Sequence, residues 1–189
     1  MRIGYNTNGL AHHSLPSAID LLAGFGYRSV AITLDHTSLN PYSADFAKCL
    51  RTIRRQLDRR GLRSVVETGA RYLLDPKHKH EPTMVSLRGE QRQRRVDFLQ
   101  HAVDAANELG SDCVSLWSGA VHDDAAEEEA ICRLIESLEQ VVKYAERKQT
   151  PIGFEPEPGM LIDSMKAFER LLGQIDSPQL GLTIDVGHL

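Results

Sequence analysis

The sequence places acidic side chains directly after two short apolar runs. Glu155 follows residues 152–154, and Asp185 follows residues 181–184. A charged side chain at the end of a buried strand is costly unless it is paired or bound to a metal ion. If the two runs are neighbouring parallel strands, their carboxylates repel each other, and a divalent cation relieves that repulsion. Hard carboxylate oxygens favour Mn²⁺ or Mg²⁺, with Zn²⁺ or Co²⁺ also possible.

Simpler roles compete with this metal site. Glu155 could cap the helix that follows, and Asp185 could form a salt bridge with an arginine. His188 comes one tight turn after Asp185, a turn that Gly187 permits. The histidine could therefore bind the same metal, contact a substrate or simply be exposed. Glu157, in a proline-flanked turn, could hydrogen-bond substrate hydroxyls or orient a ligand.

Three other residues at the ends of apolar runs are candidates for substrate binding. Glu67 could bind substrate or orient a ligand, or it could form a salt bridge with Arg71 at the rim. His36 follows Asp35, and either side chain could face a pocket. Trp117 could form an apolar wall for a substrate ring, or it could simply pack in the core.

The elements that position these residues alternate in type. Strand-like runs, near-continuous in apolar residues as in a sheet covered on both faces, occupy residues 2–6, 29–34, 64–67, 113–117, 152–155 and 180–185. Segments with helical periodicity occupy residues 17–25, 44–60, 91–109, 125–148 and 165–175. Glycine follows three of these segments, as is usual at a helix C-terminus. This alternation predicts a parallel α/β architecture.

Two parallel architectures fit this order: an open doubly wound sheet and a (β/α)8 barrel. No GxGxxG or GxxxxGK[ST] motif follows a strand, which removes the main nucleotide-binding signatures of open sheets. A barrel gathers polar strand ends into one ring, where its active sites form. We therefore predict a (β/α)8 TIM barrel. Because a complete barrel takes about 250 residues, we expect residues 1–189 to be a single domain that lacks its last two βα units.

The paired strand-end motifs resemble those of the xylose isomerase-like TIM-barrel superfamily. These motifs are Glu155-Pro156 and Asp185-Val186-Gly187-His188. The group includes sugar phosphate isomerases and epimerases, ketose 3-epimerases, hydroxypyruvate isomerases and endonuclease IV. The resemblance spans the whole chain and implies that Glu155 and Asp185 are metal ligands. It also implies a substrate-contacting or metal-binding role for His188, and two further ligands, a histidine and a glutamate, on later strands absent from this sequence.

By this resemblance we expect a divalent-metal-dependent isomerase or epimerase acting on a sugar, a sugar phosphate or a related hydroxy-carbonyl compound. Removal of a weakly acidic C–H proton gives an enediolate, whose charge a metal ion stabilises while a carboxylate moves the proton. Glu155 is the available base. An endonuclease IV-like phosphodiesterase and a non-catalytic metabolite-binding relative are the alternatives, and the 189-residue chain alone could be inactive.

Two charged segments remain. The connection of residues 72–89 is long for a βα loop, where about two to six residues are usual, and it contains Lys77, His78, Lys79 and His80. It could be a lid that binds a phosphate or carboxylate, or a solvated loop. The basic run 88–95 is expected on one charged helical face. Because no aromatic residues are interleaved with it, we expect no nucleic-acid partner.

Composition narrows the setting. The net charge is −4, and three cysteines, an odd number, show no metal-binding spacing. No apolar run approaches the roughly 20 residues of a membrane span, and no signal segment is recognisable. We therefore expect a cytoplasmic protein with a small carbohydrate-like substrate and no membrane partner. Unpaired sheet edges in an incomplete barrel also make a homo-oligomer possible.

Overall fold

The computed structural model describes residues 1–188, with side chains through residue 187. Six parallel strands form one sheet whose spatial order follows the chain, β1-β2-β3-β4-β5-β6. A doubly wound sheet reverses its strand order, so this sequential order confirms the predicted barrel-type α/β fold, of which the chain covers a part. The strands are β1 (Gly4–Asn6), β2 (Ser29–Thr33), β3 (Arg63–Glu67), β4 (Val114–Leu116), β5 (Ile152–Phe154) and β6 (Leu180–Leu182).

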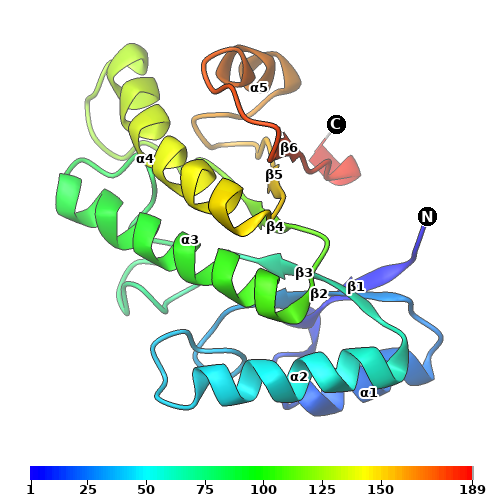
Figure 1. Ribbon diagram of the computed structural model, residues 1–189. Coiled ribbons are helices and arrows are strands. Elements are labelled where there is room, and N and C mark those ends of the chain that lie inside the picture. The colour runs from blue at the N-terminus through cyan, green and yellow to red at the C-terminus, as the bar shows by residue number, and fades with distance from the viewer. Residues whose placement is uncertain (189) are drawn as a thin grey trace.

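A helix follows each of the first five strands, and the helices lie along one side of the curving sheet (Figure 1). Left-handed glycines end two of them, Gly61 with φ 63° and Gly110 with φ 60°, as the sequence predicted. The helices are α1 (Leu15–Gly24), α2 (Phe46–Arg60), α3 (Gly89–Leu109), α4 (Glu127–Lys148) and α5 (Met165–Leu172), with short 3₁₀ turns η1 (Thr7–Leu10) and η2 (Val186–His188). In the part of the chain that the structure describes, no helix is long and apolar enough to span a membrane.

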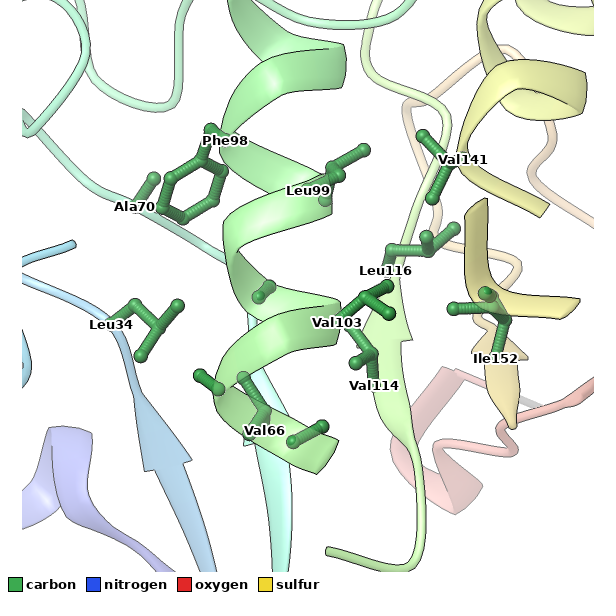
Figure 2. Close-up of a cluster of buried hydrophobic side chains, with 14 of the residues drawn as sticks. Leu34, Val66, Ala70, Phe98, Leu99, Val103, Val114, Leu116, Val141 and Ile152 are labelled. Atoms are coloured by element: carbon green, nitrogen blue, oxygen red, sulfur yellow. The ribbon is translucent and has the colours of Figure 1, made fainter. Parts of the chain in front are cut away.

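The apolar core lies between the outer face of the sheet and these helices. Val66, Val114 and Leu116 point from the strands toward the helices and are completely buried. Figure 2 shows Val114 close to Val103 of α3, and Leu116 close to Val141 of α4. Because side chains alternate between the faces of a strand, this packing leaves the other face for the barrel interior.

The inner face carries a row of polar or very small residues. The strand register places Thr33 beside Glu67, Glu67 beside Ser115, Ser115 beside Gly153, and Gly153 beside Gly181. Parallel strands in register present the same face at each level, so this row lines the concave interior of the partial barrel. Near the carboxyl ends of its strands, the sheet therefore has an apolar outer face and an inner face of polar or very small residues.

The two edge strands are shorter and more exposed than their sequences predicted. Pairing of β6 ends at Leu182, which is 36% exposed, and Ile184 is 55% exposed. A strand does form at Leu180–Leu182, but the expectation that residues 181–184 are buried was wrong, because within the described residues β6 pairs only with β5. At the other edge, β1 begins at Gly4 rather than at Arg2.

Candidate active site

The parallel arrangement brings the carboxyl ends of all six strands to one rim. On that rim Thr33 Oγ1 lies 3.2 Å from Asn6 Oδ1 and 3.2 Å from Glu67 Oε2, and its single proton can go to either oxygen. The backbone N–H of Gly69 also donates to Glu67 Oε2, at 3.2 Å. The half-buried carboxylate of Glu67 is thus held by the Gly69 N–H and, when its proton is directed there, by the Thr33 hydroxyl. The alternative role considered for Glu67 was a salt bridge with Arg71, and no such salt bridge forms among the residues described.

A buried arginine lies beneath this part of the rim. Arg95 of α3 is completely inaccessible, and its Nη2 donates to the carbonyl oxygen of Thr68 at 2.8 Å. Its Nη1 has no hydrogen-bond partner within residues 1–187. Desolvation lowers the pKa of Arg95 to about 10, although the negative charges of Glu67 and Glu81 act in the opposite direction.

The burial of Arg95 corrects the expectation that the basic run 88–95 lies on one charged face. The helix places residue 95 one turn before Leu99 and two turns before Ala102 and Val103, all of which face the core. That periodicity was visible in the sequence, but the charge of the arginine concealed it. Arg94, by contrast, is exposed.

Trp117, at the end of β4, is held by two neighbours. The guanidinium carbon of Arg95 lies 4.6 Å from the centre of a Trp117 ring, in cation–π geometry. The imidazole of His80 meets the indole edge-on, with the ring centres 5.7 Å apart. Only 7% of Trp117 is exposed. Contact between Trp117 and a substrate therefore stays a prediction. A substrate would meet only the part of the indole that Arg95 and His80 leave exposed.

The turn after β3 has an unusual backbone. Ala70 and Arg71 have positive φ angles of 56° and 35°, and His80 has a φ of 70°. Such angles are strained for residues with a side chain, and they concentrate at functional sites. Tight hydrogen bonds hold the turn: Arg71 N–H donates to Gly69 O at 2.7 Å, and His80 N–H donates to Arg71 O at 2.6 Å.

The same turn places the imidazole of His80 against the backbone of Gly69. His80 Nδ1 lies 2.6 Å from Gly69 O, and because a carbonyl only accepts, Nδ1 carries the proton. This hydrogen bond leaves Nε2 of the neutral ring as an acceptor. A Cβ built on Gly69 would lie 3.3 Å from Glu67 Oε2 and 3.8 Å from His80 Cε1. The side chains of Glu67 and His80 thus both lie near Gly69, an arrangement that the sequence did not reveal.

The long connection between β3 and α3 is fastened at both sides of an exposed centre. Its flanks bury Leu73, Leu74, Met84 and Val85 in the core. From α4, Ser137 Oγ lies 3.1 Å from Met84 O and 2.9 Å from Arg133 O, and its one proton can go to either carbonyl. Residues 77–79 in the centre are exposed. Anion binding by Lys77, His78 and Lys79 stays a prediction, as does the action of the connection as a lid.

The predicted metal ligands follow adjacent strands. Glu155 N–H donates to Leu116 O at 2.8 Å, and Thr183 N–H donates to Phe154 O at 2.8 Å, which extends the β4-β5-β6 pairing to the rim. Glu155 is half-buried, whereas Asp185 is exposed and its Oδ1 accepts the Gly187 N–H at 2.8 Å. The expected strand adjacency is therefore present. A shared cation stays a prediction.

The side chains that the structure describes add no third ligand of the His, Cys, Asp or Glu type to Glu155 and Asp185. Through residue 187, no group of three or more His, Cys, Asp or Glu side chains is arranged to hold a metal ion. The side chain of His188 lies outside the described residues, so its predicted role is unaffected by this observation. The two carboxylates of Glu155 and Asp185 match part of the oxygen-rich coordination shell of a hard divalent cation.

Two further predicted substrate contacts lie in well-defined turns. His36 is exposed after β2, and its N–H donates to Asp35 Oδ1 at 2.7 Å. Glu157 is half-buried, and its N–H donates to Ile162 O at 3.0 Å, which fixes the turn after β5. The roles of both side chains in substrate binding stay predictions.

Comparisons with known proteins agree with this architecture. The sequence profile of the family described as xylose isomerase-like TIM barrel matches residues 19–189. A parallel barrel sheet whose polar residues meet at the carboxyl rim is the arrangement on which barrel enzymes build their sites. The chain belongs to the xylose isomerase-like TIM barrel family.

Individual relatives are distant. An uncharacterized protein of Methanocaldococcus jannaschii, MJ1311, is 26% identical over 140 residues, which cover 62% of this chain and 46% of that protein. A D-tagatose 3-epimerase-like protein superposes with a TM-score of 0.79 at 22% identity, covering 100% of this chain and 66% of its own. The D-allulose 3-epimerase from Methylomonas sp., in complex with D-allulose, gives 0.77 at 17% identity, covering 100% and 63%. The chain thus spans less than two thirds of the length of these proteins.

Proposed function

We propose that the protein is a divalent-metal-dependent isomerase or epimerase acting on a sugar or a related hydroxy-carbonyl compound. The observation that carries the proposal is that Glu155 and Asp185 follow β5 and β6, two adjacent strands of a barrel of this family. Structural similarity to D-psicose 3-epimerase, L-ribulose 3-epimerase and a D-tagatose 3-epimerase-like protein supports the reaction class. Because the sequence identity to these proteins is low, the substrate and the native metal are also part of the proposal.

In this proposal Glu155 and Asp185 hold the cation, together with His188 or groups outside the described residues. When bound, a divalent ion of this type withdraws charge from the oxygens of an α-hydroxy carbonyl and makes the neighbouring C–H bond more acidic. Mn²⁺ or Mg²⁺ suits the carboxylate donors best, and Zn²⁺ or Co²⁺ would also be accommodated.

The other roles fall to side chains on the same rim. Glu155 removes the proton from the acidified C–H bond, because a carboxylate beside that bond is suited to general base chemistry. Glu67, fixed by Thr33 and Gly69, accepts a hydrogen bond from a substrate hydroxyl. Trp117 presents the part of its ring that Arg95 and His80 leave open. Glu157, His36 and His188 are further substrate contacts in the proposal.

The test combines metal analysis with proton exchange on the intact protein. Purified protein should bind about one divalent ion per chain. The Mn²⁺-loaded form should exchange a C–H proton of a ketose for deuterium from D₂O, and NMR measures this exchange. Glu155→Gln and Asp185→Asn should each lower the metal content and abolish exchange. Glu128→Gln, an exposed residue in the first turn of α4, is the matched control and should change neither.

Two results would count against the proposal. Metal content that is unchanged in both carboxylate variants would show that the ion is bound elsewhere. Metal-loaded protein that exchanges no proton on any of a panel of ketoses, aldoses and their phosphates would exclude the reaction class.

A further inference from the structure

Arg71 is a cation at the barrel rim that has no anionic partner within residues 1–187. Its guanidinium makes one long contact, Nη2 to the carbonyl oxygen of Asn8 at 3.5 Å. No carboxylate lies within 4 Å of it among the residues that the structure describes. The residue is only half-buried, so most of its five N–H donors remain available to a ligand.

The backbone holds this side chain in place at an energetic cost. Arg71 has a φ of 35° and follows Ala70 at 56°, and both angles are unfavourable for residues with a Cβ. Strain of this kind persists only where surrounding contacts impose it, as the hydrogen bonds from Arg71 to Gly69 and from His80 to Arg71 do. The turn directs the arginine away from β3 and over the ends of the first two strands, where Asn8 lies.

The guanidinium borders a small hollow between the ends of β1 and β2. Its volume is about 30 Å³, which is the space of a single oxygen-sized group. Ser38, in its wall, has a buried hydroxyl with no hydrogen-bond partner within residues 1–187. Asn8 and His13 also line it. The hollow thus combines a cation with unused hydrogen-bonding capacity, which suits one oxygen of an anionic group.

The hollow adjoins the candidate active site. Thr33 lines its wall and also belongs to the inner-face row beside Glu67. Between β2 and β5, which carries Glu155, there are three strand steps of about 4.8 Å each. A ligand that reaches both places would therefore have its anionic group at one end and its reacting carbons at the other.

We propose that Arg71 and this hollow bind an anionic group of the substrate, a phosphate or a carboxylate, at the end remote from the reacting carbons. The inference rests on the proposed function and narrows its substrate class to acidic hydroxy-carbonyl compounds. Asp35 also lines the hollow, with its Oδ1 occupied by the His36 N–H at 2.7 Å. The anion therefore lies on the arginine side, and Asp35 weakens its binding by repulsion.

The experiment compares three substrates on the intact, Mn²⁺-loaded protein: a ketose phosphate, a ketose carboxylate and the neutral ketose of the same chain length. We expect kcat/KM to be higher for one of the two acidic compounds by about tenfold or more, because hydrogen bonds between charged groups are roughly this strong. The preferred acidic compound identifies the group that the site takes.

Arg71→Gln should remove that preference, lowering kcat/KM for the acidic substrate by about tenfold and leaving the neutral ketose unchanged. Glutamine keeps the backbone strain of a non-glycine residue, so the comparison isolates the charge. Arg71→Lys should retain part of the preference, and Asp35→Asn should increase it. Arg59→Gln, an exposed arginine on α2, is the control and should have no effect.

A preference for the neutral ketose, or an equal loss on all three substrates in folded Arg71→Gln, would overturn the inference while leaving the reaction class intact. If the protein turns over none of them, the proposed function fails, and binding of D-fructose 6-phosphate by titration calorimetry then decides. Weaker binding in Arg71→Gln than in the wild type would support the anion site. Equal binding, or none, would overturn it. Should Arg71→Gln not fold, Arg71→Lys and Asp35→Asn provide the same comparison.

Discussion

The guanidinium of Arg95 and the indole of Trp117 are stacked 4.6 Å apart, and neither is accessible to more than a few per cent. The pair joins α3 to the end of β4, and the hydrogen bond from Arg95 to Thr68 O joins the same helix to the end of β3. Within the described side chains, no carboxylate lies within 4 Å of Arg95, and a buried cation of this kind costs free energy. We infer that it is tolerated because it organises two strand ends at the rim.

We expect Arg95→Ala to lower the free energy of unfolding by about 2–4 kcal/mol. The substitution removes a buried side chain and leaves the Thr68 carbonyl without its donor. Arg95→Met should cost less, because it fills much of the space and removes the desolvated charge. Urea unfolding measures both changes.

Arg94→Ala is the matched control for Arg95, since the neighbouring arginine on the same helix is exposed. It should change the unfolding free energy by no more than about 0.5 kcal/mol. If Arg95→Ala were as harmless as Arg94→Ala, the organising role of Arg95 would have to be abandoned.

The sequence alone was sufficient for the order of elements. Continuous apolar strands, helical periodicity and terminal glycines such as Gly61 and Gly110 are local signals, and each helix and strand forms near its predicted residues. The boundaries at the sheet edges were less accurate. Leu182 and Ile184 look like core residues, but their burial depends on neighbouring strands rather than on local composition.

The site was only partly predictable for the same reason. Glu67, Glu155 and Asp185 could be assigned to one rim, because parallel strands point their carboxyl ends the same way. The approach of His80 to Gly69 spans eleven residues along the chain and depends on positive φ angles at Ala70, Arg71 and His80. No local sequence pattern indicates these angles. The unpaired state of Arg71 likewise follows from where the turn places it.

Gly153 provides a test of the contact between the strands that carry the predicted metal ligands. A Cβ on this residue would lie 2.3 Å from Thr183 Oγ1, so Gly153→Ala should force β5 and β6 apart. We expect a loss of about 1–3 kcal/mol in unfolding free energy and a lower metal content. Denaturant unfolding and metal analysis provide the two readouts.

Two further variants test the clash between residues 153 and 183. Thr183→Ala in the Gly153→Ala background removes the clashing hydroxyl, so it should recover most of the lost stability. Gly24→Ala on α1 meets no atom within 4 Å and should be neutral or stabilising by up to about 1 kcal/mol. A Gly153→Ala protein as stable as the wild type would show that the two strands separate easily.

Glu67→Gln separates the two roles considered for this residue. If Glu67 binds substrate, the variant should lose about tenfold in kcat/KM for the proposed reaction while its metal content stays unchanged, because a neutral amide is a weaker acceptor than a carboxylate. A fall in metal content would instead indicate that Glu67 orients a ligand. Glu108→Gln, exposed near the end of α3, should affect neither quantity.

The loop before α3 should become less stable in acid because of Asp75. A hydrogen bond with His78, whose Nδ1 lies 3.0 Å from Asp75 Oδ2, and the N–H of Lys77 lower the pKa of Asp75 from 3.8 to about 2. The unfolded chain therefore binds more protons than the folded chain between these values. The stabilisation is fully present above pH 3.8 and is lost as the pH falls toward 2.

Asp75→Asn removes this dependence, so the difference in unfolding free energy between wild type and variant should shrink as the pH falls from about 5 to 2. His78→Ala removes the main cause of the lowered pKa and should move the loss of stability to higher pH, toward 3.8. Urea unfolding at several pH values measures both effects, and hydrogen exchange at the Lys77 and His78 amides locates them in the loop. A difference between wild type and Asp75→Asn that stays constant over this range would mean that the carboxylate of Asp75 titrates alike in the folded and unfolded chains.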